Sequence, residues 1–126
     1  MTREEALNRA KELICGEREK QYGDPEELFT EVATLWTHYL GVDYLITATD
    51  AAIMMALLKV ARITSSHWGG RYSEDNFVDL IGYAAIAAEL EGLRQAQLAR
   101  LGTSPDKPDR PAFASTDEEI PHTSYL

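Results

Sequence analysis

The chain has 126 residues, of which 44% are hydrophobic and 26% are charged, which suits a single globular domain of the soluble class. Its formal net charge of −9 argues against a nucleic acid or an anionic membrane as the main partner, because both require a basic face. The single cysteine, Cys15, excludes an internal disulfide. We expect it to be a packed thiol in a cytoplasmic protein.

The first half of the chain predicts two helices. The first covers roughly Thr2 to Gln21, where apolar residues recur at positions i, i+3, i+4 and i+7. It is expected to end near Gly23, since glycine readily adopts the left-handed conformation that closes a helix. The second begins after Asp24, a typical N-cap, with Pro25 at its first position and Glu27 completing a capping box. A broad apolar face follows until the next glycine.

The third helix is predicted from about Thr49 to Ile63, with Thr47 or Thr49 as its cap. Its apolar residues surround it almost completely, which is typical of a helix buried on most sides or placed in a subunit interface. A four-helix bundle of this size rarely encloses one of its own helices, so we expect a homo-oligomer. The apolar run is too short to span a bilayer and carries Lys59 and Arg62, so no membrane is expected.

The segment TSSHWGGRYS is expected to be a loop, with Ser73 capping a fourth helix that continues to about Leu101. From Gly102 the chain holds four of its five prolines and shows no helical period, which predicts an extended or disordered tail. The predicted fold is therefore an all-α, four-helix domain over residues 1–101, followed by an irregular tail over residues 102–126.

The residue most in need of explanation is Asp79, which lies within an apolar helix and requires a partner if it is buried. On a helical wheel it shares one stripe with Asp75 and Gly82, and Asn76 and Tyr83 flank that stripe. A helical glycine costs up to about 1 kcal/mol relative to alanine, so something is expected to approach closely here. Two carboxylates one turn apart beside a gap can hold Mg²⁺.

A purely structural interpretation stays open for the same stripe. Asp75 would then complement the helix dipole, Asp79 would pair with Lys59 or Arg62 of the third helix, and Gly82 would be a helix-crossing contact.

Further acids could join Asp79. Glu27 and Glu31 lie one turn apart on the second helix. Asp50 opens the third helix, where it is either the capping-box partner of Thr47 or an acid at the mouth of the bundle.

The basic residues suggest contacts with phosphate. Lys59 and Arg62, one turn apart, could grip a phosphate as hydrogen-bond donors. Arg18, Lys20 and Tyr22 could add cationic and aromatic contacts to a nucleotide, or they form an ordinary solvated helix end.

Three segments, REKQYGDPEELFTEVATLW, DAAIMMALLKVARI and DNFVDLIGYAAIAAEL, resemble in this order a family of small phage and prophage proteins of unknown function, over about residues 10 to 90. More distantly, the layout is similar to the MazG-like all-α nucleotide pyrophosphohydrolases. That resemblance implies an oligomer in which carboxylates bind Mg²⁺ and activate water. Glu31 with Glu27 would form the first acidic motif and Asp79 the second, which makes Glu31 and Asp79 the catalytic candidates. Asn76 stands where the second motif usually has an acid.

The resulting hypothesis is a Mg²⁺-dependent nucleoside triphosphate pyrophosphohydrolase, acting in the host cytoplasm if phage-encoded. Two alternatives stay open. One is a protein that binds and sequesters a nucleotide without hydrolysing it, and the other is a structural helical oligomer without a ligand.

Overall fold

The computed structural model describes residues 1–16, 20–21 and 23–102. This part of the chain is helical and contains no strand, which confirms the all-α prediction. Its helices are α1 (Arg3–Cys15), α3 (Pro25–Leu40), α4 (Ala48–Trp68) and α5 (Glu74–Arg100). Most of the predicted C-terminal tail lies outside the described residues, as do Arg18 and Tyr22.

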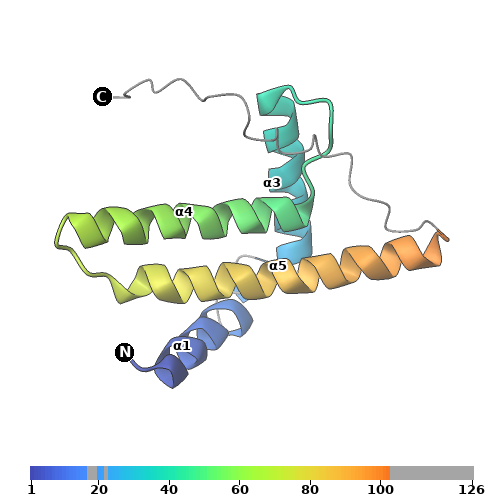
Figure 1. Ribbon diagram of the computed structural model, residues 1–126. Coiled ribbons are helices and arrows are strands. Elements are labelled where there is room, and N and C mark those ends of the chain that lie inside the picture. The colour runs from blue at the N-terminus through green and yellow to red at the C-terminus, as the bar shows by residue number, and fades with distance from the viewer. Residues whose placement is uncertain (17–19, 22, 103–126) are drawn as a thin grey trace, which may run out of the picture.

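The long helices α4 and α5 form an antiparallel hairpin, and their contact is the most extensive between any two described helices (Figure 1). The helix α3 crosses one end of this hairpin and packs on α4, whereas α1 packs on α5. None of the described helices is long and apolar enough to cross a membrane.

Local sequence explains where the helices begin. The side chain of Thr47 accepts a hydrogen bond from the backbone N–H of Asp50, and the Asp50 carboxylate accepts one from the N–H of Thr47, so the predicted capping box is confirmed. Asp24 caps α3 as expected, with Pro25 at the first position. Its carboxylate, however, accepts from the N–H of Glu26 at 3.0 Å rather than from that of Glu27.

The first helix is shorter than predicted. It ends at Cys15 instead of Gln21, and Gly16 follows it. Lys20 and Gln21 are helical again beyond this break. Because Cys15 is the last residue of α1, its thiol is exposed, so the prediction of a packed thiol was wrong. The left-handed conformation expected at Gly23 is confirmed, with φ of 82°.

The third helix is longer than predicted and continues past Ile63 to Trp68. The hydroxyl of Thr64 donates to the carbonyl of Val60 at 3.0 Å, so a residue that was assigned to a loop is accommodated inside the helix. The turn to α5 is made instead by the glycines at 69 and 70, the second with φ of 68°.

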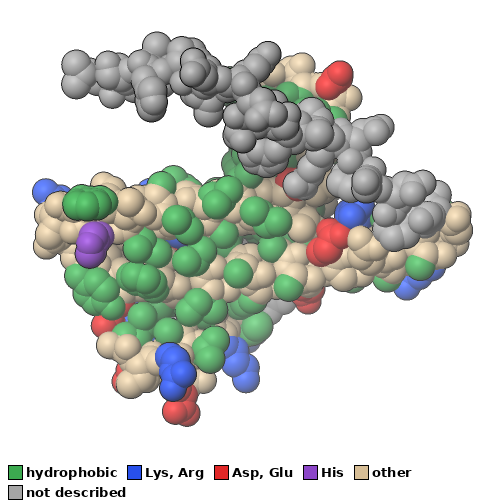
Figure 2. Space-filling view, in the orientation of Figure 1, with side chains coloured by type: hydrophobic (Ala, Val, Ile, Leu, Met, Phe, Trp, Pro, Cys, Tyr) green, Lys and Arg blue, Asp and Glu red, His purple; other side chains and the backbone are tan. Residues whose placement is uncertain are grey.

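The core of the described part is thin and rich in alanine. It gathers where α3 and the α4–α5 hairpin meet, and its members are Phe29, Ala33, Ile46, Ala51, Ala52, Ala87 and Leu90. Alanine lets helix axes approach closely, but no large side chain among the described residues is fully buried. Much of the apolar surface of α4 remains exposed, and Figure 2 shows hydrophobic side chains spread across the hairpin.

Candidate functional site

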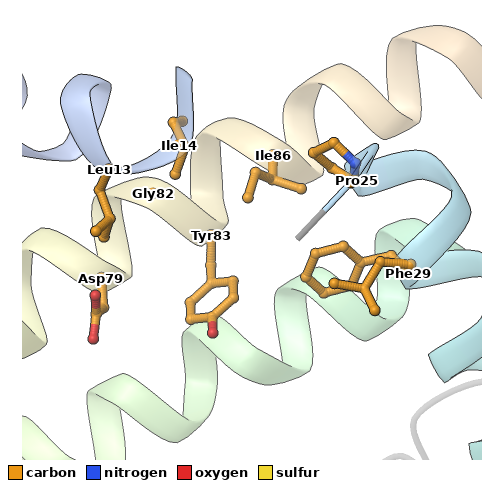
Figure 3. A pocket seen from close by; sticks show the side chains of 10 residues that line it. Leu13, Ile14, Pro25, Phe29, Asp79, Gly82, Tyr83 and Ile86 are labelled. Carbon is orange, nitrogen blue, oxygen red and sulfur yellow. The ribbon is translucent and has the colours of Figure 1, made fainter. Parts of the chain in front are cut away.

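A pocket of about 290 Å³ lies where α1, α3 and α5 meet. Most of its lining is apolar, and among the described lining residues Asp79 is the one that is charged. Figure 3 shows Asp79 and Tyr83 projecting from the same side of α5 toward α4. The lining residues are Leu13, Ile14, Gly23, Pro25, Leu28, Phe29, Asp79, Gly82, Tyr83 and Ile86.

Asp79 forms an ion pair with Lys59 of α4. The Lys59 Nζ lies 2.8 Å from Oδ2 of Asp79, and the lysine is 8% exposed, whereas the aspartate side chain is 27% exposed. The sequence left Lys59 and Arg62 as alternative partners. The antiparallel packing of α4 on α5 brings Lys59 to Asp79, whereas Arg62 is exposed.

Gly82 allows α1 to lie close to α5. A Cβ atom added at this glycine would lie 3.0 Å from Cγ2 of Ile14. The close approach predicted from the glycine is therefore confirmed, and the neighbour is an apolar side chain of α1. Ile14 and Gly82 both line the pocket, so this contact forms part of its wall on the side of α1.

An aromatic pair joins α3 to α5 in the pocket wall. The rings of Phe29 and Tyr83 have centroids 6.3 Å apart and planes inclined at 85°, an edge-to-face arrangement. Tyr83, which flanks the Asp79 stripe, therefore lines the pocket together with Phe29.

The other predicted metal ligands lie apart from this pocket. Asp75 is exposed and its Oδ1 accepts from Arg9 at 2.7 Å, so it helps to fasten α1 to α5. Asp50 belongs to the cap of α4, and Glu27 and Glu31 are exposed on α3. Among the described residues, no three acidic, histidine or cysteine side chains gather as a metal site requires.

The remaining ligand candidates are only partly placed. Asn76 is half-buried on α5, and Lys20 is exposed. Arg62 is exposed on α4, one turn beyond Lys59. None of these three lines the pocket. Of the predicted site residues, Asp79 and Tyr83 thus lie together in the pocket, and the ion pair with Asp79 brings Lys59 beside them.

Sequence reasoning treated the apolar walls of the pocket as ordinary core. Leu28 and Phe29 of α3, for instance, belong to a long apolar face, and no local signal marks them as pocket residues. Their role depends on how α3 meets α5, which periodicity does not determine.

A second polar cluster, missed in the sequence, connects the start of α4 to the far half of α5. The Glu91 carboxylate accepts from Arg94 at 2.8 and 2.9 Å, from Gln95 at 2.7 Å and from Thr49 at 3.1 Å. These bonds, that of Arg94 foremost, lower the pKa of Glu91 to about 2. The i, i+3 and i+4 spacing of the three α5 residues was the available signal.

In the described part of the chain, the helices and the pocket define a small all-helical protein with a mostly apolar pocket at a helix junction. The chain belongs to the family described as "Domain of unknown function (DUF6378)", whose model matches residues 5–91. This range includes the pocket and the Lys59–Asp79 pair, and it confirms the predicted membership in a phage protein family of unknown function.

Two phage proteins are similar to this chain. It is 40% identical over 86 residues to "Gene 55 protein" of Mycobacterium phage L5 and 42% identical over 87 residues to "Gene 55 protein" of Mycobacterium phage D29. The matches cover 68% and 69% of this chain but 51% and 54% of those proteins, so the chain spans about half the length of the curated relatives it matches. No solved structure matches significantly.

Proposed function

We propose that this protein binds a nucleotide, or a related phosphorylated small molecule with a planar base, without hydrolysing it. The observation that carries the proposal is the pocket between α1, α3 and α5, whose described walls are mostly apolar and include one carboxylate, that of Asp79. Small-molecule sites typically combine such walls with a few polar groups that orient the ligand.

The pocket has the size and chemistry for a base rather than for a whole nucleotide. Its volume of about 290 Å³ lies just below the range for ligand sites, roughly 300–1,000 Å³. The Phe29–Tyr83 pair offers aromatic surface, and the Asp79 carboxylate can accept a hydrogen bond from an amino group or ring N–H of a base. The sugar and phosphates would lie outside the pocket, and Arg62, exposed on α4 one turn beyond Lys59, is the donor proposed to contact them.

A Mg²⁺-dependent pyrophosphohydrolase is the second candidate, supported by the place of Asp79 in the pocket and by the resemblance of the acidic motifs. It requires more carboxylates beside Asp79, because a hard cation is held by several oxygen ligands. Glu31 and Asp50 are not among the pocket residues, so these ligands would have to come from the nucleotide itself or from another chain.

The full-length protein should be incubated with a panel of nucleoside mono-, di- and triphosphates, with and without Mg²⁺. Both the melting temperature and pyrophosphate release should be followed. Binding without hydrolysis predicts a rise in melting temperature for at least one nucleotide, without pyrophosphate release. Mg²⁺-dependent pyrophosphate release would favour the second candidate. No response to any nucleotide would refute both.

A pair of variants on α3 tests whether the pocket is the site. Leu28 lines the pocket and is 44% exposed, so Leu28→Trp is expected to fill the entrance and abolish the thermal shift. Leu35 lies on the same helix outside the pocket and is 60% exposed, so Leu35→Trp is the matched control and should leave the shift unchanged. Equal behaviour of the two variants would place the ligand elsewhere.

A further inference from the structure

The carboxylate of Asp79 determines which hydrogen-bonding groups a ligand can bring into the pocket. Its Oδ2 lies 2.8 Å from the Nζ of Lys59, which is 8% exposed and is not among the residues that line the pocket. An ionised carboxylate has about four lone-pair positions on its two oxygens, so Asp79 keeps acceptor capacity after this bond is made. Since Lys59 already supplies the counter-charge, a cation in the pocket would be uncompensated, and a neutral hydrogen-bond donor fits better.

The pocket presents this acceptor beside aromatic surface. Figure 3 shows Asp79 and Tyr83 projecting from the same side of α5, and residues four apart on a helix have Cβ atoms about 5–6 Å apart. A planar base whose edge meets the carboxylate therefore has its rings beside Tyr83, whose own ring packs edge-to-face on Phe29. Proteins read an unpaired base in this way, with hydrogen bonds to its edge and aromatic or apolar side chains against its faces.

The common bases differ in what their hydrogen-bonding edges offer to a carboxylate. Guanine presents two adjacent donors, the N1–H and the 2-amino group, which match the two oxygens of one carboxylate. Adenine and cytosine each place a ring-nitrogen acceptor beside their amino group, and uracil and thymine place a carbonyl on either side of their N3–H. In these other bases an acceptor faces the carboxylate, which leaves acceptors without a donor and is costly between apolar walls.

We infer that the base bound in this pocket is guanine, held by paired hydrogen bonds from its N1–H and its 2-amino group to the carboxylate of Asp79. The inference rests on the proposed function, because it concerns the same pocket. Lys59 is a positioning residue, since its bond to Oδ2 fixes the carboxylate without contact to the base. The apolar side chains of Leu13 and Ile14, from α1, limit the access of water to the pocket and so strengthen the paired bonds.

A ligand series on the wild-type protein tests the assignment without disturbing the fold. Dissociation constants of guanosine, inosine and adenosine monophosphates should be measured with the full chain by isothermal titration calorimetry. Inosine keeps the N1–H but lacks the 2-amino group, so it loses one of the two bonds and should bind about tenfold more weakly than guanosine. Adenosine presents an acceptor at N1 and should bind about a hundredfold more weakly. Equal binding of guanosine and inosine, or tighter binding of adenosine, would overturn the assignment.

The variant Asp79→Asn provides the reciprocal test. The ammonium of Lys59 only donates, so it keeps the carbonyl oxygen of the new amide on its own side and leaves the amide nitrogen, a donor, in the place of the other oxygen. A donor there favours xanthine, which carries a carbonyl group where guanine has its 2-amino group. The variant should therefore bind guanosine monophosphate about tenfold more weakly, and xanthosine monophosphate more tightly, than the wild type does. Titrations well below the melting temperature of the variant keep it folded.

Asp75→Asn is the matched control, because Asp75 lies one turn away on α5 and is not among the pocket residues, so the order of the bases should not change. If Asp79 served only to hold Lys59, Asp79→Asn would lower the melting temperature but keep the wild-type order of the bases, and the assignment would be wrong. Tightest binding of another base would sink the guanine assignment and leave the proposed function standing. The absence of binding by any nucleotide would remove both.

Discussion

Replacing Asp79 by asparagine is expected to destabilise the fold, because the change leaves the ammonium of Lys59 without its counter-charge. Lys59 is 8% exposed and lies 2.8 Å from the carboxylate. Asparagine preserves the shape of the side chain but removes the negative charge. Removing one member of a buried ion pair costs roughly 3–5 kcal/mol. Since the Asp79 side chain is 27% exposed, water offsets part of this cost, and we expect about 2–3 kcal/mol.

For a helical domain of this size, 1 kcal/mol corresponds to about 4–8 °C in melting temperature, so Asp79→Asn should melt roughly 10–20 °C below the wild type. Thermal melts followed by circular dichroism, together with urea unfolding, measure the effect. Asp75→Asn is the control, because the Asp75 side chain is 80% exposed and its ion pair is expected to contribute less than about 1 kcal/mol. The double variant Lys59→Met/Asp79→Leu removes both charges and should recover most of the stability.

A melting temperature of Asp79→Asn at or above that of the wild type would refute this reasoning. The Lys59–Asp79 pair would then contribute nothing to stability. Failure of the double variant to recover would show instead that the loss comes from packing around position 79 rather than from the stranded charge.

Three further predictions follow from the described contacts. The pKa of Glu91 is lowered from 4.5 to about 2, so its stabilising contribution is present above pH 4.5 and lost as the pH falls toward 2; the difference in melting temperature between wild type and Glu91→Gln should shrink over that window. Gly92→Ala should stabilise the fold by about 0.5–1 kcal/mol, because its added Cβ meets no atom within 4 Å. Gly82→Ala should gain less stability, since its added Cβ would press on Ile14 of α1. Equal gains in the free energy of unfolding in urea would contradict this close contact. Thr47→Ala should cost about 1 kcal/mol through loss of the cap, whereas Ser73→Ala should be nearly neutral, because Ser73 makes no side-chain cap bond; thermal melts compare the two.

The starts of the helices were predictable because they depend on neighbouring residues. Asp24 with Pro25 and Thr47 with Asp50 are signals complete within four positions, and the structure places a helix start at each. The residues at which the helices end were less predictable, since α1 ends earlier and α4 later than expected. Thr64 was assigned to a loop because of its residue type, but its hydroxyl can bond to the preceding turn and let the helix continue.

The candidate site was predictable only in part, because it depends on how distant helices align. The sequence indicated that Asp79 needs a partner and that Gly82 permits close approach, and both expectations are confirmed. It did not distinguish Lys59 from Arg62, since both lie on the same helix, and only the alignment of α4 with α5 separates them. It also gave no signal that Arg9 would reach Asp75 across 66 positions of the chain.

The attachment of α1 has a consequence for the order in which the chain folds. The helices α4 and α5 are joined by residues 69–73 alone, so their contact closes a very short loop and can form early. The bonds from Arg9 to Glu74 and Asp75 span 65 and 66 positions, so α1 reaches α5 only at a much larger loop-closure entropy. We therefore expect the pocket wall that α1 supplies to form after the α4–α5 hairpin and to open before it. Amide hydrogen exchange should be faster in α1 than in the middle of the hairpin, and a ligand seated against Leu13 and Ile14 would slow it.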